Sequence, residues 1–255
     1  QLVDNCAPLA RILKKTPSII GQIPTTDSSD SGVTRGVAKV GSPWKGWLYQ
    51  YQGVLGPIPE LAKNANAVGM MIIAPEGDGV VRRMPLVVAV GDEVYPSISL
   101  EVLRMAAGDV SYQMKTGPAG VEAIRIPKFK IIKTDANANI WLDFKWRTPV
   151  HALHEKLPDL NGKIVILSMT ATGLDNPVST PMGVIHSHDL IGASLATMMT
   201  GRNITRPFWT DLAELGTSFG LGLLLMVVVL LLPWYIGAVA MPASVVGLFY
   251  GSSDR

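Results

Sequence analysis

The pattern of apolar and polar positions separates a long segment of mixed character from a strongly apolar C-terminal segment. Residues 212–232 form an almost uninterrupted apolar run in which Glu214 is the only formal charge. At about 1.5 Å per residue, a helix of this length spans roughly 30 Å, which matches the hydrocarbon core of a bilayer. Burial of the run in a soluble core is the alternative. We predict a domain at residues 1–207 and a transmembrane region at residues 208–255.

A second apolar run, residues 236–250, follows Pro233 and two aromatic residues. Proline interrupts a helix and aromatic rings favour the headgroup layer, so the two runs together predict a transmembrane helical hairpin. Arg202 and Arg206 lie just before the first run, which on the positive-inside rule places the domain in the cytoplasm. That rule weakens for long flanking domains, so charge alone leaves the orientation open.

Within residues 1–207, helical and strand-like patterns alternate, which is typical of an α/β domain with a mixed β-sheet and flanking helices. Residues 22–39 have the composition of a loop. Helices are expected at residues 7–13, 59–67, 98–105 with Ser97 as N-cap, 149–156, and 189–200 with Gly201 as the stop. Strands are expected at residues 68–73, 86–90 and 163–167, with a meander at 121–126, 129–132 and 140–144.

Composition and charge exclude several classes of protein. The chain has 48% hydrophobic residues, enough for one sizeable core, and a net charge of +2 that does not indicate a nucleic-acid partner. The single cysteine, Cys6, cannot form an internal disulfide. No nucleophile elbow, zinc-protease motif, P-loop or Rossmann glycine pattern occurs, so we expect neither an enzyme nor a cofactor.

Two polar segments are candidate ligand sites. In the turn at Asp78-Gly-Val-Val-Arg82, the carboxylate and the guanidinium can pair bidentately, either to fix the turn or to grip an anionic or polyol ligand. The loop after the expected strand at residues 163–167 carries hydroxyl groups at an edge where α/β sheets place ligand crevices. Its candidate residues are Ser168, Thr170, Thr172 and Asp175, although Asp175 and Thr180 can instead satisfy backbone donors.

The four histidines form two pairs and are candidates for a metal or pH-sensitive site. His151 and His154 are three residues apart on the expected helix, and His186 and His188 alternate beside Asp189. Such spacing suits Zn²⁺ or Cu²⁺, but solvated histidines fit the same pattern.

Three motifs of the sequence are together similar to those of one protein family. The stretch from Gly69 to Pro85 is similar to the family's strand and D-G-x-x-R turn. Residues 160–175, with Thr180-Pro-Met-Gly, resemble its L-x-G-K-x-V-x-V-G-x-x-A-x-G-x-x-D and T-P-x-G motifs. Residues 201–207 look like the family's exit toward its membrane helices. Over residues 7–250 the chain thus resembles the type-2 CHASE domain, an extracytoplasmic sensory module of bacterial receptors. Ser168 replaces a usual glycine, and the segment at Ser187 departs from the usual G-V-E-x-H-A.

The resemblance implies a membrane-anchored ligand-sensing domain of a bacterial signal-transduction receptor. By the same resemblance, the main domain would lie in the periplasm at the inner membrane and would signal to a cyclase or kinase output that this chain lacks. The expected partners are the lipid bilayer, an unknown small-molecule ligand, and other membrane subunits or a homo-oligomer. The alternative is a structural or accessory subunit of a larger membrane complex that retains the sensory fold, and a metal- or pH-responsive domain is a third hypothesis.

Overall fold

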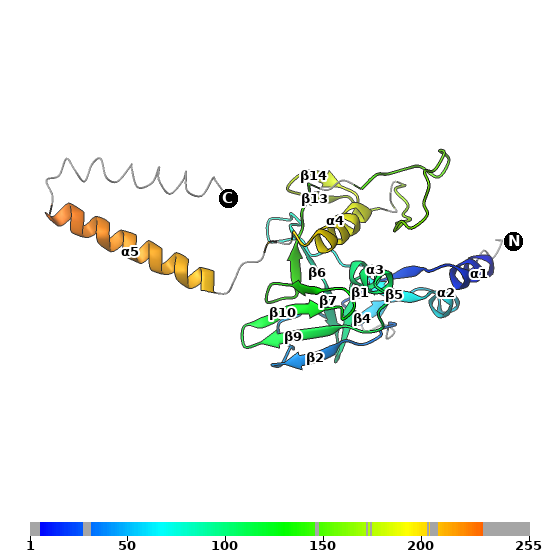
Figure 1. Ribbon diagram of the computed structural model, residues 1–255, viewed down its shortest axis with the longest axis horizontal. Helices are drawn as coiled ribbons and strands as arrows, with labels where there is room; N and C mark the ends of the chain where they lie inside the picture. Colours follow the sequence, from blue (N-terminus) through cyan, green and yellow to red (C-terminus); the bar gives the residue numbers. More distant parts are fainter. Residues whose placement is uncertain are drawn as a thin grey trace. The chain divides into compact units, whose positions relative to one another are not determined.

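The computed structural model describes residues 6–27, 32–145, 148–171, 173, 175–202, 204 and 209–231. The chain separates into two compact units, Gln1–Thr205 and Arg206–Arg255. In the described residues, the first unit contains four helices and five small β-sheets rather than one mixed sheet (Figure 1). The α/β class is therefore confirmed, and the sheet is divided more finely than predicted.

A three-stranded sheet, ordered β4-β1-β5, lies next to the N-terminal helices. It contains β1 (Ile19–Thr25), β4 (Gly53–Leu55) and β5 (Ala67–Met70). Strand β1 pairs parallel with β5 and antiparallel with β4. The prediction of a loop at residues 22–39 is wrong at both ends. Gln22 pairs with β5, residues 23–25 pair with β4, and another strand begins at Ala38, because pairing with neighbouring strands outweighs the turn-forming composition.

Two helices, one just before β1 in the chain and one just before β5, pack against each other. They are α1 (Cys6–Lys15) and α2 (Pro59–Asn64). Pro59 occupies the first turn of α2, as predicted, because its missing N–H would be unpaired there in any case. Helix α2 ends earlier than predicted because Ala67 already belongs to β5.

The second sheet contains β2 (Ala38–Gly41), β9 (Gln113–Gly117), β10 (Gly120–Arg125) and β11 (Ile131–Lys133), in the order β11-β10-β9-β2. Strands β9 to β11 form an antiparallel meander, and β2 pairs parallel with β9. The predicted third run of the meander is instead β12 (Asn139–Trp141), which pairs with β6 (Arg83–Pro85). This pairing carries Asp135, just before β12, to the vicinity of β6.

The main core forms where a buried sheet meets α3 and α4. Strands β3 (Gln50–Tyr51), β7 (Val87–Val90) and β8 (Glu93–Pro96) form a sheet ordered β3-β7-β8. Helix α3 (Ile98–Ala106) begins at the predicted cap, where Ser97 Oγ accepts a hydrogen bond from the Leu100 N–H. The core includes Leu86, Leu100, Met114, Ile124 and Leu190, all fully buried.

The last part of this unit is a hairpin followed by a helix. Strands β13 (Val178–Thr180) and β14 (Gly183–Ile185) pair antiparallel, and α4 (Ser187–Thr200) follows and packs on α3. Gly201 ends α4 in the left-handed conformation, with φ 71°, as the sequence predicted.

Two predicted elements between β12 and β13 are wrong. Residues 149–156 contain no helix, and Val150 and Leu153 are 67% and 74% exposed. So short a helix is marginal without a packed face, and none is available here. Residues 163–167 form no strand, because within the described chain no strand pairs with them, and Val165 and Leu167 are 57% and 76% exposed. Only Ile166 of this segment packs against the main core.

The second unit contains α5 (Trp209–Leu231), which confirms helical structure over almost all of residues 212–232. Leu232 and the predicted second run, residues 236–250, lie outside the described residues. Among the helices that the structure describes, none meets the length and hydropathy expected of a membrane span.

Candidate functional site

The turn between β5 and β6 is fixed by the predicted pair of Asp78 and Arg82. Arg82 Nη1 and Nη2 lie 3.1 and 2.7 Å from Asp78 Oδ1 and Oδ2, a two-point arrangement that orients both groups. Asp78 Oδ1 also accepts from the Val80 N–H at 3.0 Å, and Gly79 adopts φ +78°. Glycine suits this position because a Cβ atom disfavours that backbone conformation. The predicted pairing is therefore confirmed, and a ligand role for it stays a prediction.

This pair is one end of a larger ionic network that the sequence did not reveal. Glu76 binds both arginines, with Oε2 2.9 Å from Arg82 Nη1 and Oε1 2.9 Å from Arg83 Nε. Arg83 Nη1 also lies 3.0 Å from Asp135 Oδ2, and its guanidinium lies 5.0 Å from the Trp141 ring. Glu76 and Arg83 are adjacent to the recognised motif, but Asp135 is distant in sequence and is brought close only by the β6–β12 pairing.

The electrostatics of the network favour its ionised form. Hydrogen bonds from Arg82 and from the Val80 N–H lower the pKa of Asp78 to about 2. The same Asp78 contact raises the pKa of Arg82. These groups are partly exposed, with 51% exposure for the Asp78 side chain and 32% for that of Arg82. The network therefore stays charged at neutral pH and accessible to solvent, so it orders the turn and leaves polar groups at the surface.

The loop at residues 168–175 does not gather its predicted residues into one place. Ser168 and Thr170 are exposed, and neither hydroxyl forms a hydrogen bond within the described part of the chain. Thr172 lies outside the described residues. Asp175 is held elsewhere, at the N-terminus of α4, where it accepts a 2.6 Å hydrogen bond from Ser187 Oγ. The loop is therefore anchored at its Asp175 end, with free hydroxyls at its other end.

Asp175 also contacts His186, and the β13–β14 hairpin explains the meeting. Val178 lies opposite Ile185 in the hairpin, so the residues just before β13 and just after β14 are brought to the same end. Asp175 Oδ2 lies 2.5 Å from His186 Nδ1. The Asp175 side chain is only 6% exposed, whereas that of His186 is 48% exposed. An inner carboxylate thus orients an outer imidazole, an arrangement that fixes the ring and leaves its far edge open to a ligand.

The charge of this carboxylate suits its position. Hydrogen bonds from Ser187 and from His186 lower the pKa of Asp175. The α4 N-terminus adds favourable partial positive charge, because the first N–H groups of a helix have no partner within it. The carboxylate of Asp175 therefore lies where the N-terminus of α4 favours a negative charge. The alternative role predicted for Thr180, to satisfy a backbone donor, is not what the structure shows, because its Oγ1 donates to the Gly183 carbonyl at 2.7 Å.

The histidines are only partly brought together. The rings of His186 and His188 are stacked, with centroids 5.4 Å apart. His151 and His154 are exposed in a segment that forms no helix. Among the described residues, which include all four histidines, no group of three or more His, Cys, Asp or Glu side chains is suited to hold a metal ion.

A backbone contact joins the two polar sites. The Val81 N–H, one residue before Arg82, donates to the Ser179 carbonyl of β13 at 2.8 Å. Both the turn at Asp78 and the Asp175–His186 contact therefore lie beside the β13–β14 hairpin. Sequence reasoning identified both segments, but their connection depends on this tertiary contact.

Comparison with known proteins identifies the family. The family model described as the CHASE2 domain matches residues 4–231, which is most of the chain. The chain belongs to the CHASE2 family. Neither the curated proteins nor the solved structures gave a match. CHASE2 domains are sensory modules of signal-transduction receptors and are not catalytic. Within this CHASE2 domain, the D-G-x-x-R turn contains the ionic pair of Asp78 and Arg82 described above.

Proposed function

We propose that this CHASE2 chain is the membrane-anchored, extracytoplasmic ligand-sensing part of a bacterial receptor. Its output, a cyclase or a kinase, would lie outside this sequence. The observation that carries the proposal is the extent of the family match, which runs through the folded unit and on through α5. A sensory fold continued by an apolar helix is the arrangement expected of a transmitting receptor.

The side chains of α5 support the anchor. Its 23 residues correspond to about 35 Å of helix, a length comparable to the apolar thickness of a bilayer. Large apolar side chains are exposed along most of its length, with Glu214, Thr217 and Ser218 as polar positions in its first half. Exposed apolar surface of this extent needs an apolar environment. The exposed apolar side chains are Leu212, Leu215, Phe219, Leu223, Leu224, Met226, Val227, Leu230 and Leu231, each between 44% and 80% exposed. The proposed location is the bacterial inner membrane, with the main domain on the periplasmic side.

The proposed ligand is a small polar molecule bound near the loop at residues 168–175. Ser168 and Thr170 present free hydroxyls, and Asp175 ties the same loop to the first turn of α4. In the chain, α4 ends at Thr200 and α5 begins at Trp209. A ligand that changes the loop would thus act on the helix that leads to the anchor. It can shift the receptor only through different affinities for two arrangements of these helices.

An alkaline extraction experiment tests the anchor. The full chain is expressed in bacteria, and its membranes are washed with sodium carbonate at high pH, which releases peripheral proteins. The wild type should stay in the membrane, and the double variant Leu223→Arg/Val227→Arg should be released, because arginine is costly at the bilayer centre. Ile131→Arg/Val110→Arg, two exposed apolar positions of the other unit, is the matched control and should stay. Release of the wild type would refute the anchor.

A ligand screen tests the sensing role. The purified full chain in detergent is screened against small polyols, amino acids and organic acids by thermal shift. A true hit should raise the melting temperature of the wild type and not of Ser168→Ala/Thr170→Ala. Hits that are insensitive to this double variant would contradict the proposed site.

The accessory-subunit hypothesis also has a specific observation in its favour. Three apolar side chains at alternate positions of one segment are exposed to solvent: Val165, Leu167 and Met169. Such exposure is unusual for an apolar segment of a free domain. A partner subunit or a second copy would cover them. Purification from native membranes distinguishes the hypotheses: a fixed-stoichiometry complex that contains no cyclase or kinase would favour the accessory role over the receptor role.

A further inference from the structure

Helix α1 has an apolar ridge that the folded unit does not cover. Ala10 is buried and Leu13 half-buried, which shows the side of the helix that packs inward. Leu9 and Ile12 lie three residues apart on a neighbouring face and are 45% and 58% exposed. Their exposure leaves a short apolar ridge along one side of a helix of ten residues.

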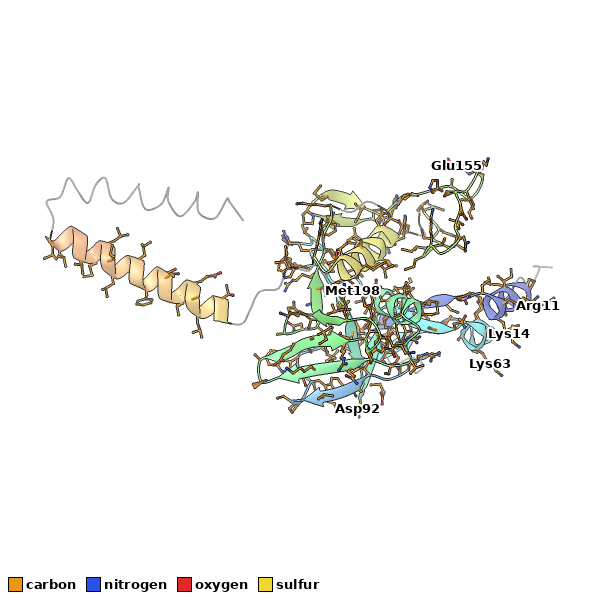
Figure 2. The ribbon with its side chains drawn as sticks, viewed as in Figure 1. Arg11, Lys14, Lys63, Asp92, Glu155 and Met198 are labelled. Atoms are coloured by element: carbon orange, nitrogen blue, oxygen red, sulfur yellow. The ribbon has the colours of Figure 1, made fainter. Side chains whose placement is uncertain are left out.

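Positive charge gathers on the polar face of α1, where Arg11 and Lys14 lie opposite the ridge and Lys15 lies next to Ile12. Arg11, Lys14 and Lys15 are exposed on α1, and Lys63 is exposed on α2, which packs against it. Figure 2 shows Arg11, Lys14 and Lys63 at the same end of the unit. Glu60 is the only acidic residue in the two helices, whereas the whole chain has a net charge of only +2. Positive charge is therefore concentrated here.

An apolar ridge on a helix whose opposite, polar face carries Lys and Arg is typical of helices that lie in the interface of an anionic membrane. The apolar side chains enter the headgroup boundary, and the cations pair with lipid phosphates. A protein partner fits less well, because a stable protein interface buries on the order of 1,000 Å² or more, far beyond two exposed side chains. We propose that α1 is a peripheral membrane-binding helix that docks on anionic phospholipid.

This inference is independent of α5, because α1 belongs to the other unit of the chain. If α5 is the anchor, α1 adds a second contact that restricts how the sensory unit is oriented. If α5 fails to insert, α1 would still attach the chain to anionic lipid in a salt-sensitive manner. Carbonate extraction tests whether α5 is inserted, and the depth of a spin label tests whether α1 docks on lipid.

A spin label at residue 16 reports the depth of α1. The full chain carries Cys6→Ser and Thr16→Cys, since Thr16 is exposed and lies beside Leu9 and Ile12 on the helical surface. The labelled chain is placed in nanodiscs of phosphatidylcholine with or without phosphatidylglycerol. Power saturation then compares collisions with oxygen, which enters lipid, and with a nickel chelate, which stays in water. A label at Glu155→Cys, which lies on an exposed segment other than α1, is the control for water exposure (Figure 2).

We expect the label at residue 16 to be shielded from nickel only in the anionic discs. Arg11→Gln/Lys14→Gln/Lys15→Gln should abolish the shielding. Each lost cation lowers partitioning into anionic lipid about fivefold, so three lost cations lower it roughly a hundredfold. Leu9→Ser/Ile12→Ser should abolish the shielding with all charges kept. The matched control Arg125→Gln/Lys156→Gln/Lys163→Gln removes the same charge from other exposed positions and should keep the shielding.

Three results would overturn the proposal. The label could be equally exposed to nickel in both lipids, or the control triple variant could reduce the shielding as much as the α1 variant does. Shielding that is equal in neutral discs or in detergent would indicate a protein contact instead of lipid. Free phosphatidylglycerol headgroup, added as glycerol phosphate, should not shield the label, because it supplies no apolar boundary.

Discussion

Asp175 Oδ2 lies 2.5 Å from His186 Nδ1, at the end of the β13–β14 hairpin where the loop at residues 168–175 meets α4. The same carboxylate accepts a hydrogen bond from Ser187 Oγ in the first turn of α4. One buried side chain therefore links the candidate ligand loop to the last helix of the sensory unit. A substitution at Asp175 can therefore test whether the loop and the helix are coupled.

Asp175→Asn should loosen this link without unfolding the domain. The amide keeps the shape but loses the charge that suits the helix N-terminus and His186. We expect severalfold faster amide hydrogen exchange at residues 168–175 and in the first turn of α4. Asp159→Asn is the control, because among the described residues the Asp159 carboxylate accepts only from the nearby Asn161 N–H. Equal exchange in wild type and Asp175→Asn would show that the link carries no coupling.

Acid should weaken the domain partly through Asp78. Its folded pKa is about 2, below the ordinary value of 3.8, so its ionised form is favoured by folding. That contribution is complete above the unfolded pKa and is lost as pH falls from about 4 through 2. Urea unfolding between pH 6 and pH 2, read out as the free energy of unfolding, should show a shallower acid loss for Asp78→Asn than for wild type. The effect should be small because the pair is exposed. Parallel curves would contradict this assignment.

The ion pair of Glu101 and Arg104 should be costly to break. Glu101 Oε2 lies 2.8 Å from Arg104 Nη2, and their side chains are 1% and 5% exposed. Removing one partner leaves a buried charge, so Glu101→Leu should lower the free energy of unfolding by about 3–5 kcal/mol. The double variant Glu101→Leu/Arg104→Met should recover most of the loss. Chemical denaturation measures both, and an undiminished loss in the double variant would mean that packing and not charge is responsible.

Two neighbouring serines should respond in opposite directions. Ser97 caps α3, so Ser97→Ala should cost about 1 kcal/mol of unfolding free energy. Ser99 Oγ is buried and has no hydrogen-bond partner among the described residues, so Ser99→Ala should be neutral or stabilising. Thermal unfolding of the two variants provides the comparison. A loss at Ser99 equal to that at Ser97 would contradict the cap assignment.

Sequence reasoning succeeded where local chemistry decides the structure. Ser97 caps α3, Gly201 ends α4, and Asp78 pairs with Arg82, all within a few residues of chain. It failed at residues 163–167, whose apolar pattern predicts a strand but which have no paired strand within the described chain. A strand depends on its partner, and no partner can be recognised from the segment itself.

The candidate site was predictable in its parts and not in its connections. The sequence predicts Asp175 and His186 as members of two different candidate sites. Their contact depends on the hairpin turn between β13 and β14, and the Arg83–Asp135 contact depends on the pairing of β6 with β12. Contacts between segments distant in sequence require the fold, because spacing along the chain does not determine them.

The topology of the chain in a living membrane tests the central proposal most directly. The full chain with Cys6→Ser and Glu155→Cys is expressed in bacteria, and spheroplasts are treated with a membrane-impermeant maleimide. Glu155 is exposed on the sensory unit, so its cysteine replacement reports the side of the membrane on which that unit lies. The proposal of an extracytoplasmic sensory domain predicts full labelling of intact spheroplasts. Labelling only after lysis would place the domain in the cytoplasm and contradict the proposal.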